Sequence, residues 1–299
     1  MDKSSCHNEY VTKCKKLKVQ FPAQCQSEQP GKEYLMDPKP IFDRDDYIGS
    51  CKLKGKVAII TGGDSGIGRS VAVLYAKEGA KVVVAYYNEH EDAKFTKHYI
   101  EQLGGECLLI AGDIKDPAFS KEIVDKTLQR FCRIDIVVNN AGVQFVKDSI
   151  LDISDEQLAL TFHTNIFGMF YLVKAALPHL QEGSCIINTT SITTYNGSSN
   201  LIDYVSTKGA IVGFTRALAH NLVDKKIRVN AVAPGYIWTP LQPASQPIED
   251  IPIFGSDSQM KRAGQPIELA PTYVYLASKD SGYVSGQVLH VDGSDSTSS

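Results

Sequence analysis

The 299-residue chain lacks any long hydrophobic run and any excess of charge of one sign. Its longest apolar stretch, residues 166–173, stops at Lys174 and is far too short to span a bilayer. The 31 basic and 34 acidic side chains give a net charge of −3. A protein that binds nucleic acid or a membrane surface electrostatically needs a basic face. We therefore expect neither a membrane partner nor a nucleic-acid partner.

Cysteine is also scarce, and its pattern excludes a disulfide framework. The seven cysteines are odd in number and unevenly spaced, which fits reduced thiols and a cytoplasmic protein. The first thirty residues lack the apolar core of a secretory signal, because Lys15, Lys16, Lys18, Pro22 and Gln24 interrupt them. The seven histidines show no HxxxH or HxH spacing, so the sequence predicts no metal site.

Residues 1–50 show little sign of regular secondary structure. They hold four of the thirteen prolines but only two of the 23 glycines, and no sustained apolar period. We interpret them as an extended or partly ordered N-terminal arm. The arm's cysteines, Cys6, Cys14 and Cys25, are too far apart for a metal clip. We expect residues 34–48 to pack on the rest of the chain or on a neighbouring subunit.

The hydrophobic pattern changes in residues 51–299, where short runs rich in Val and Ile alternate with longer amphipathic stretches. The runs predict strands at 56–60, 81–85, 107–111, 134–138, 185–188, 228–233 and 287–291. The stretches predict helices at 66–78, 92–103, 117–131, 155–180, 202–223 and 266–277. Strands that are apolar on both faces and alternate with helices indicate a covered parallel sheet. The expected fold is therefore α/β: a doubly wound, Rossmann-type parallel sheet of about seven strands in a single domain.

A glycine-rich turn joins the first strand to the first helix, in the sequence Thr61-Gly62-Gly63-Asp64-Ser65-Gly66-Ile67-Gly68-Arg69. Glycines admit positive φ and let the backbone approach a ligand closely. The helix that follows presents unpaired N–H groups and a positive dipole end, which suit a pyrophosphate. The spacing is Gly-x3-Gly-x-Gly rather than the common G-x-G-x-x-G, and the flanking strand and helix favour dinucleotide binding.

Polar loops follow three other strands at the edge where such sheets bind ligands. Asp113 follows the third strand, and Asn139-Asn140-Ala141-Gly142 follows the fourth. After the second strand, a carboxylate would favour NAD and a basic group NADP. This chain has Tyr86-Tyr87-Asn88 there and supplies neither, so the choice between NAD and NADP stays open.

Four polar residues form a candidate catalytic group. Tyr204 and Lys208 stand four positions apart on a predicted helix, so both side chains lie on one face. A nearby cation lowers the pKa of a tyrosine, which is otherwise about 10, toward the range useful for proton transfer. Ser191 ends the fifth strand, where its hydroxyl can bond a carbonyl oxygen. Asn165 lies in an apolar helical stretch, where it needs a hydrogen-bond partner: kink-freed backbone or a water.

Together these motifs resemble, in order and spacing, the short-chain dehydrogenase/reductase family. The resemblance rests on the glycine-rich turn, Asn139–Gly142, Asn165, Ser191, Tyr204-x3-Lys208 and Pro234-Gly235, and it spans about 250 residues, from Lys52 to Gly293. Within the family, the chain is similar to the bacterial branch with an N-terminal arm, which contains general-stress and glucose/ribitol-type oxidoreductases. Gln29-Pro30-Gly31 and Met36-x-Pro38-x-Pro40 carry this narrower likeness, together with Gly264-Gln265-Pro266-x-Glu268-Leu269-Ala270.

The resemblance implies a role for each matching residue. Tyr204 would pass a proton to or from the substrate oxygen, while Lys208 would lower its pKa and hold the nicotinamide ribose. Ser191 would orient the carbonyl, and Asn165 would anchor a water in the proton relay. The cofactor-binding residues, besides Tyr204 and Lys208, would be Gly62, Asp64, Ser65, Gly66, Ile67, Gly68, Asp113, Ile114, Asn140, Ala141, Gly142, Pro234, Gly235, Ile237 and Thr239.

The sequence thus predicts an NAD(P)-dependent oxidoreductase that interconverts a secondary alcohol and a carbonyl compound, such as a sugar, polyol or ketone. Residues 241–263, rich in proline, should cover the substrate. Alternatives are a 3-oxoacyl-thioester reductase of the same family and a non-catalytic nucleotide sensor. A sugar-nucleotide epimerase would be expected to carry a different glycine spacing and a larger C-terminal region. The family's common use of its long helices as interfaces implies a homo-oligomer, a dimer or tetramer.

Overall fold

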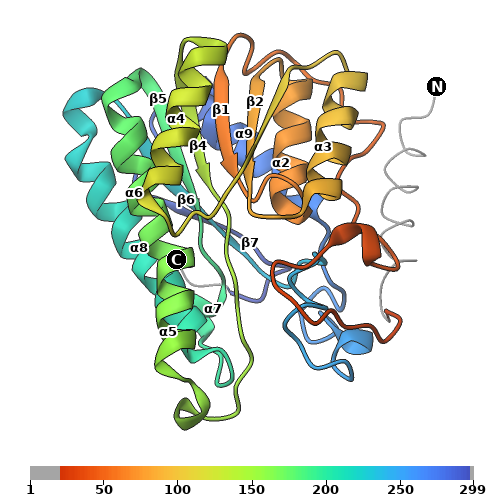
Figure 1. Cartoon of the computed structure of the whole chain (residues 1–299). Helices are drawn as coiled ribbons and strands as arrows, with labels where there is room; N and C mark the ends of the chain where they lie inside the picture. The colour runs from red at the N-terminus through yellow and green to blue at the C-terminus, as the bar shows by residue number, and fades with distance from the viewer. Residues whose placement is uncertain (1–20, 297–299) are drawn as a thin grey trace.

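The computed structural model describes residues 21–296 and contains one seven-stranded parallel sheet (Figure 1). The strand order is β3-β2-β1-β4-β5-β6-β7, so the order reverses between β1 and β4. This confirms the predicted doubly wound α/β fold. The strands are β1 (Val57–Thr61), β2 (Lys81–Tyr86), β3 (Cys107–Ala111), β4 (Ile134–Asn139), β5 (Leu180–Thr189), β6 (Arg228–Pro234) and β7 (Val288–Val291). Cys6, His7 and Cys14 of the expected arm lie outside the described residues.

Helices cover both faces of the sheet, and the central strands β1 and β4 are therefore buried on both sides. The long helices are α2 (Gly66–Lys77), α3 (His90–Gln102), α4 (Pro117–Phe131), α8 (Ile202–Asn221) and α9 (Pro266–Ala277). Alternate residues of β1 point to opposite layers: Ala58 and Ile60 pack with α2 and α9, whereas Val57 and Ile59 pack with α4 and α8. The resulting two apolar layers hold the sheet rigid, so its strand ends make a fixed platform for a site.

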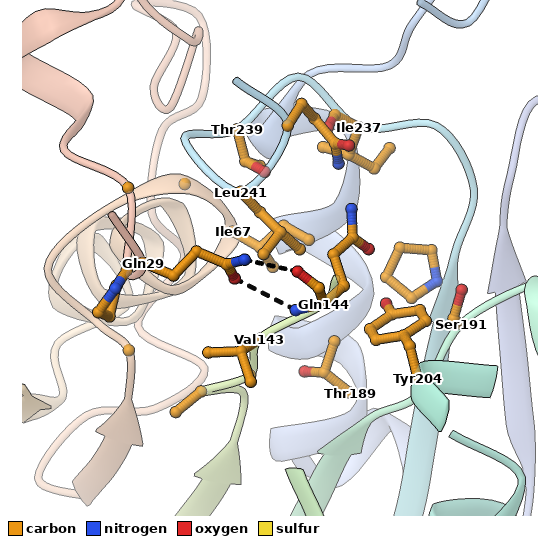
Figure 2. A pocket seen from close by; sticks show the side chains of 18 of the residues that line it. Gln29, Ile67, Val143, Gln144, Thr189, Ser191, Tyr204, Ile237, Thr239 and Leu241 are labelled. Atoms are coloured by element: carbon orange, nitrogen blue, oxygen red, sulfur yellow. Dashed lines mark hydrogen bonds between the residues drawn. The ribbon is translucent and has the colours of Figure 1, made fainter. Parts of the chain in front are cut away.

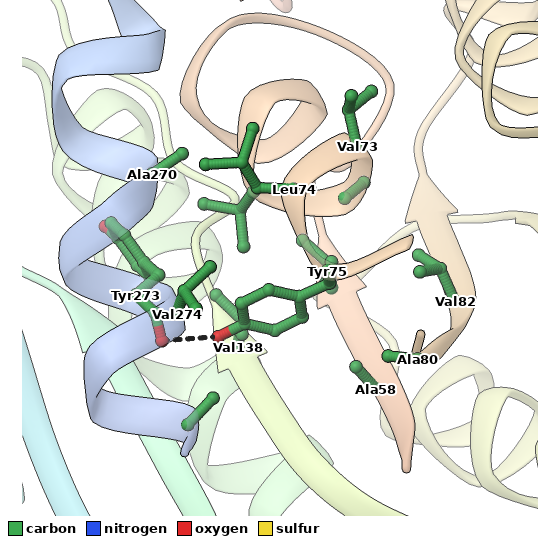
Figure 3. Packing of buried hydrophobic residues seen from close by; sticks show 14 of the residues in the cluster. Ala58, Val73, Leu74, Tyr75, Ala80, Val82, Val138, Ala270, Tyr273 and Val274 are labelled. Atoms are coloured by element: carbon green, nitrogen blue, oxygen red, sulfur yellow. Dashed lines mark hydrogen bonds between the residues drawn. The ribbon is translucent and has the colours of Figure 1, made fainter. Parts of the chain in front are cut away.

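Tyr75 links the two helices, α2 and α9, that cover one face of the sheet (Figure 3). Its ring is fully buried among Leu74, Val138 and Val274. Its hydroxyl donates a hydrogen bond of 3.0 Å to the carbonyl of Tyr273 on α9. A buried phenol needs such a partner, because an unpaired buried hydroxyl is costly. The bond ties α2, which carries the glycine-rich turn, to α9.

The long helix predicted at 155–180 is wrong as a single element. The structure has α5 (Asp155–Phe162), a π-helical segment (His163–Phe167) and α6 (Gly168–Ala176), followed by a 3-10 turn (Leu177–His179). A π segment inserts one residue into the helical hydrogen-bond ladder and commonly occurs at functional sites. Asn165 lies at its centre. The apolar periodicity of the sequence could not reveal an interruption that lasts a single turn.

Residues 21–50 run along the body of the chain and contain one short 3-10 helix, Glu33–Leu35. The ring of Phe21 stacks on Trp238 with centroids 3.9 Å apart, and Trp238 Nε1 donates 2.8 Å to the carbonyl of Pro38. At the far end, the carboxylate of Glu78, which follows α2, accepts hydrogen bonds from Ser50 N and Lys52 N. These contacts hold the segment from the loop after β6, beside the candidate site, to the opposite edge of the sheet, where β1 begins (Figure 1).

Within residues 21–296, no helix is long and apolar enough to cross a bilayer. Over the same range, no group of three or more His, Cys, Asp or Glu side chains is placed to hold a metal ion.

Candidate active site

A cavity of about 800 Å³ opens at the carboxyl ends of β1, β4, β5 and β6. Residues from each strand end line it, including Gly62, Asn140, Thr190 and Gly235. This is the edge at which doubly wound sheets bind ligands, beside the point where the strand order reverses. The cavity also reaches Gln29, Pro30 and Gly31 of the N-terminal segment.

The glycine-rich turn has the backbone that the sequence predicts. Gly62 and Gly66 adopt φ values of +62° and +51°, which other residues rarely reach. Gly68 faces inward instead of lining the cavity: a Cβ atom there would lie 1.9 Å from the carbonyl oxygen of Gly62. The absence of a side chain at Gly68 therefore allows α2 to begin directly against the turn.

A buried arginine, Arg69, anchors this turn to the rest of the protein. Arg69 forms ion pairs with Glu33 of the N-terminal segment and with Asp92 of α3, and its Nε donates to the carbonyl of Asp64. Glu33 also accepts a 2.6 Å hydrogen bond from the backbone N–H of Gly66. Burial raises the pKa of Glu33, and the guanidinium of Arg69 opposes that shift. The N–H of Gly66 is thus already occupied by protein, so Gly66 shapes the turn.

Tyr204, Lys208 and Ser191 converge on the same cavity (Figure 2 shows the first and last of these). Tyr204 and Lys208 lie on one face of α8, as their spacing predicts, with Lys208 Nζ 5.3 Å from the centre of the tyrosine ring. Lys208 Nζ donates 2.9 Å to the carbonyl of Thr189 at the end of β5. Ser191 lies beside Tyr204 in the cavity (Figure 2), and its hydroxyl acts to lower the pKa of the phenol.

Burial dominates the protonation of this group. It raises the pKa of Tyr204 to about 12, against an opposing effect of the hydrogen bond with Ser191. Burial also lowers the pKa of Lys208 to about 8. Tyr204 is therefore a protonated donor at neutral pH, and Lys208 is the group that titrates within the physiological range. Desolvation is thus the largest effect on the pKa of Tyr204, and the lowering that the resemblance attributes to Lys208 stays a prediction.

Asn165 lies behind the cavity, fully buried in the π segment. Its amide bonds both backbone groups of Val143, with Oδ1 accepting at 2.8 Å and Nδ2 donating at 2.9 Å, and Nδ2 also donates to Thr207. A Cβ atom at Gly142 would lie 3.3 Å from this Oδ1 and 3.7 Å from Lys208 Nζ. Gly142 thus leaves open the space between the amide and the ammonium group.

Two buried carboxyl groups line the cavity beyond the end of β2. Burial and the charge of Glu89 raise the pKa of Asp64 to about 7. Glu89 is 3% exposed, and its Oε1 has no hydrogen-bond partner. A buried oxygen without a partner is costly unless a ligand satisfies it.

The structure brings most of the sequence-predicted site residues together. The cavity lining includes, from the predicted catalytic and cofactor-binding sets, Gly62, Asp64, Ser65, Gly66, Ile67, Asp113, Ile114, Asn140, Ala141, Gly142, Ser191, Tyr204, Lys208, Pro234, Gly235, Ile237 and Thr239. Gly68 and Asn165 are not among the lining residues. Sequence reasoning missed Gln29, Glu89 and Gln144, which also line it.

Comparison with known proteins agrees with this geometry. Residues 62–293 match the family described as enoyl-(acyl carrier protein) reductase. An uncharacterized oxidoreductase of Bacillus subtilis is 60% identical over 92% of this chain and 96% of its own length. General stress protein 39 of Bacillus subtilis is 57% identical to this chain, and a glucose and ribitol dehydrogenase of Daucus carota is 50% identical. Each of these two alignments also covers 92% of this chain and 96% of the relative.

A crystal structure of a short-chain dehydrogenase from Burkholderia cenocepacia, in complex with NADP, superimposes with a TM-score of 0.75 at 30% identity. It covers 81% of this chain and 98% of its own. The chain belongs to the short-chain dehydrogenase/reductase family. It is an NAD(P)-dependent oxidoreductase, and the resemblance that its motifs carry is confirmed.

The residues of this short-chain dehydrogenase/reductase fit a nicotinamide dinucleotide. Gly62, at positive φ, brings bare backbone close to the start of α2, where a pyrophosphate is favourable. Glu89 offers an unpaired buried acceptor near the end of β2, and Lys208 offers a buried donor in the same cavity. The dinucleotide supplies the hydride chemistry, and the protein supplies binding, orientation and proton transfer.

Proposed function

We propose that this chain interconverts an alcohol, either secondary or primary, with the corresponding ketone or aldehyde. The proton chemistry is carried by Tyr204, Lys208, Ser191 and Asn165. The observation that carries the proposal is the convergence of a buried phenol, a buried ammonium group and a serine hydroxyl on a cavity beside a dinucleotide turn. The similarity to a glucose and ribitol dehydrogenase of Daucus carota supports this substrate class over a thioester.

A bound nicotinamide would supply the hydride for the carbonyl carbon. In reduction, Tyr204 donates its proton to the carbonyl oxygen. Ser191 donates a hydrogen bond that holds this oxygen near the phenol. Lys208, held by Thr189, provides positive charge as the phenolate forms. The open space beside Gly142, between Asn165 and Lys208, suits a water that returns the proton. Oxidation follows the same steps in reverse.

We also propose that the protein is cytoplasmic and forms a homo-oligomer, a dimer or tetramer. The support for an oligomer is the exposure of the large apolar side chains Leu158, Phe167 and Phe170 along α5, the π segment and α6. Large apolar groups gathered on a surface commonly mark an interface. A solution mass equal to that of one chain, 32.7 kDa, would contradict this proposal.

Replacing Tyr204 with Phe removes the proton donor and leaves the ring in place. We expect carbonyl reduction to fall by about 100-fold or more, the scale of general acid catalysis, while cofactor affinity stays nearly unchanged. Nicotinamide absorbance measures the first quantity, and a thermal-shift titration measures the second. Tyr195→Phe, a change outside the catalytic group, serves as the control. Tyr204→Phe activity close to that of the unaltered protein would contradict the proposed function.

We further propose that Glu89 makes the protein prefer NAD. The unpaired Oε1 of Glu89 would accept a hydrogen bond from a ribose hydroxyl, and the carboxyl groups of Glu89 and Asp64 would repel a 2′-phosphate. Among the described cavity residues, the cations are Lys115 and Lys208. Lys115 is paired with Asp113, and Lys208 lies beside Tyr204, so neither is available to a 2′-phosphate at the end of β2.

Changing Glu89 to Gln keeps the shape of the side chain and removes its charge. We expect the ratio of kcat/KM for NAD to that for NADP to fall about tenfold, mainly because NADP improves. Glu91→Gln, an exposed position on the same helix, controls for the loss of one charge. A preference of the unaltered protein for NADP, or a ratio that Glu89→Gln leaves unchanged, would rule out this role.

A further inference from the structure

Gln29 of the N-terminal segment reaches into the cavity and pairs with the main chain of Gln144 (Figure 2). Its Nε2 donates 2.5 Å to the carbonyl of Gln144, and its Oε1 accepts 3.2 Å from the N–H of Gln144. Because a backbone N–H can only donate, these two bonds fix which way the Gln29 amide faces. A residue of the arm thereby holds the main chain that follows the Asn139–Gly142 motif.

The Gln144 side chain is also fixed, from its other side. The hydroxyl of Ser245 donates to the carbonyl of Leu241 at 2.6 Å, so toward Gln144 the Ser245 oxygen acts as an acceptor. The group that faces it must therefore be the NH₂ of Gln144, which donates at 2.8 Å. No residue that the structure describes forms a hydrogen bond with the remaining amide oxygen, Oε1 of Gln144, and the side chain, 4% exposed, lines the cavity.

The surroundings make this arrangement rigid. Gly31 packs so closely on the same loop that a Cβ atom there would lie 2.2 Å from the carbonyl oxygen of Pro240. The backbone N–H of Gln26 donates 2.7 Å to the carbonyl of Pro243. The arm and the loop that carries Ser245 thus form one wall of the cavity. In Figure 2, Gln144 lies between Gln29 on one side and Tyr204 and Ser191 on the other.

We propose that Gln29 is a positioning residue for substrate recognition: it holds Gln144 so that Gln144 Oε1 accepts a hydrogen bond from a hydroxyl group of the substrate next to the reacting carbon. An acceptor that a bound substrate covers selects a donor, because a substrate without one leaves the acceptor unpaired. The substrate class is therefore hydroxylated aldehydes and polyols. This inference rests on the proposed oxidoreductase function and adds its specificity.

The test uses two pairs of substrates that differ in hydroxyl groups beside the reacting carbon. D-Glyceraldehyde is compared with propanal in reduction, and ribitol with pentan-3-ol in oxidation, by kcat/KM from nicotinamide absorbance. We expect the full-length protein to prefer the hydroxylated member. Gln144→Leu and Gln29→Leu should each reduce this preference about tenfold, the value of one neutral hydrogen bond. Gln29→Glu, which keeps the shape but loses the donor, should reduce it in the same direction.

Gln26→Leu is the matched control. Gln26 makes the same two-point pairing, but with the main chain of Lys32 within the arm and away from the cavity. We expect it to leave the preference unchanged, and all variants to keep the KM for the cofactor within about twofold.

Two results would overturn the inference while the proposed function stands. One is equal turnover of both members of each pair by the unaltered protein. The other is a raised cofactor KM in Gln144→Leu with the preference retained, which would assign Oε1 to the nicotinamide carboxamide. Turnover of none of the four substrates would instead overturn the proposed function together with the inference.

Discussion

The active site depends on the burial of one ammonium group. Lys208 is 3% exposed, and no carboxylate among the described residues pairs with it. A buried charge without a partner is costly, and the pKa of Lys208 falls to about 8 as a result. The fold holds the group by the carbonyl of Thr189, while Thr190 Oγ1 donates 2.8 Å to the carbonyl of Lys208. These bonds fix the end of β5 against the first turns of α8, and this arrangement places Ser191 beside Tyr204.

A second buried group, the guanidinium of Arg69, links this centre to the rest of the cavity. Glu33, Asp92 and the carbonyl of Asp64 surround it, so the arm, α3 and the glycine-rich turn meet at one side chain. Removing one partner of such a buried pair typically costs about 3–5 kcal/mol, because the remaining charge is left uncompensated. The N-terminal arm is thus bound at the turn by Glu33 and at the cavity wall by Gln29. Residues 21–50 of the arm thus form part of the site.

Much of this arrangement could be predicted from the sequence because local patterns encode it. The strands read as short Val- and Ile-rich runs, and the spacing of Tyr204 and Lys208 places both on one helix face. The π segment around Asn165 could not be predicted, since it changes hydrogen bonding without changing apolar periodicity. Gln29 and Gln144 are 115 positions apart, and no single-sequence pattern relates them. Glu89 belongs to no motif in the sequence, and only its burial with an unpaired oxygen marks it as an acceptor.

The pH dependence of alcohol oxidation tests the central claim, that a desolvated Lys208 governs proton transfer through Tyr204. Lys208 becomes neutral as the pH rises through about 8, and it can then accept the proton that oxidation releases. We predict that kcat/KM for oxidation rises with pH, with an apparent pKa near 8, and then levels off, since kcat/KM reports the ionisations of the free enzyme. A profile without an inflection between about pH 7 and 9 would contradict the account.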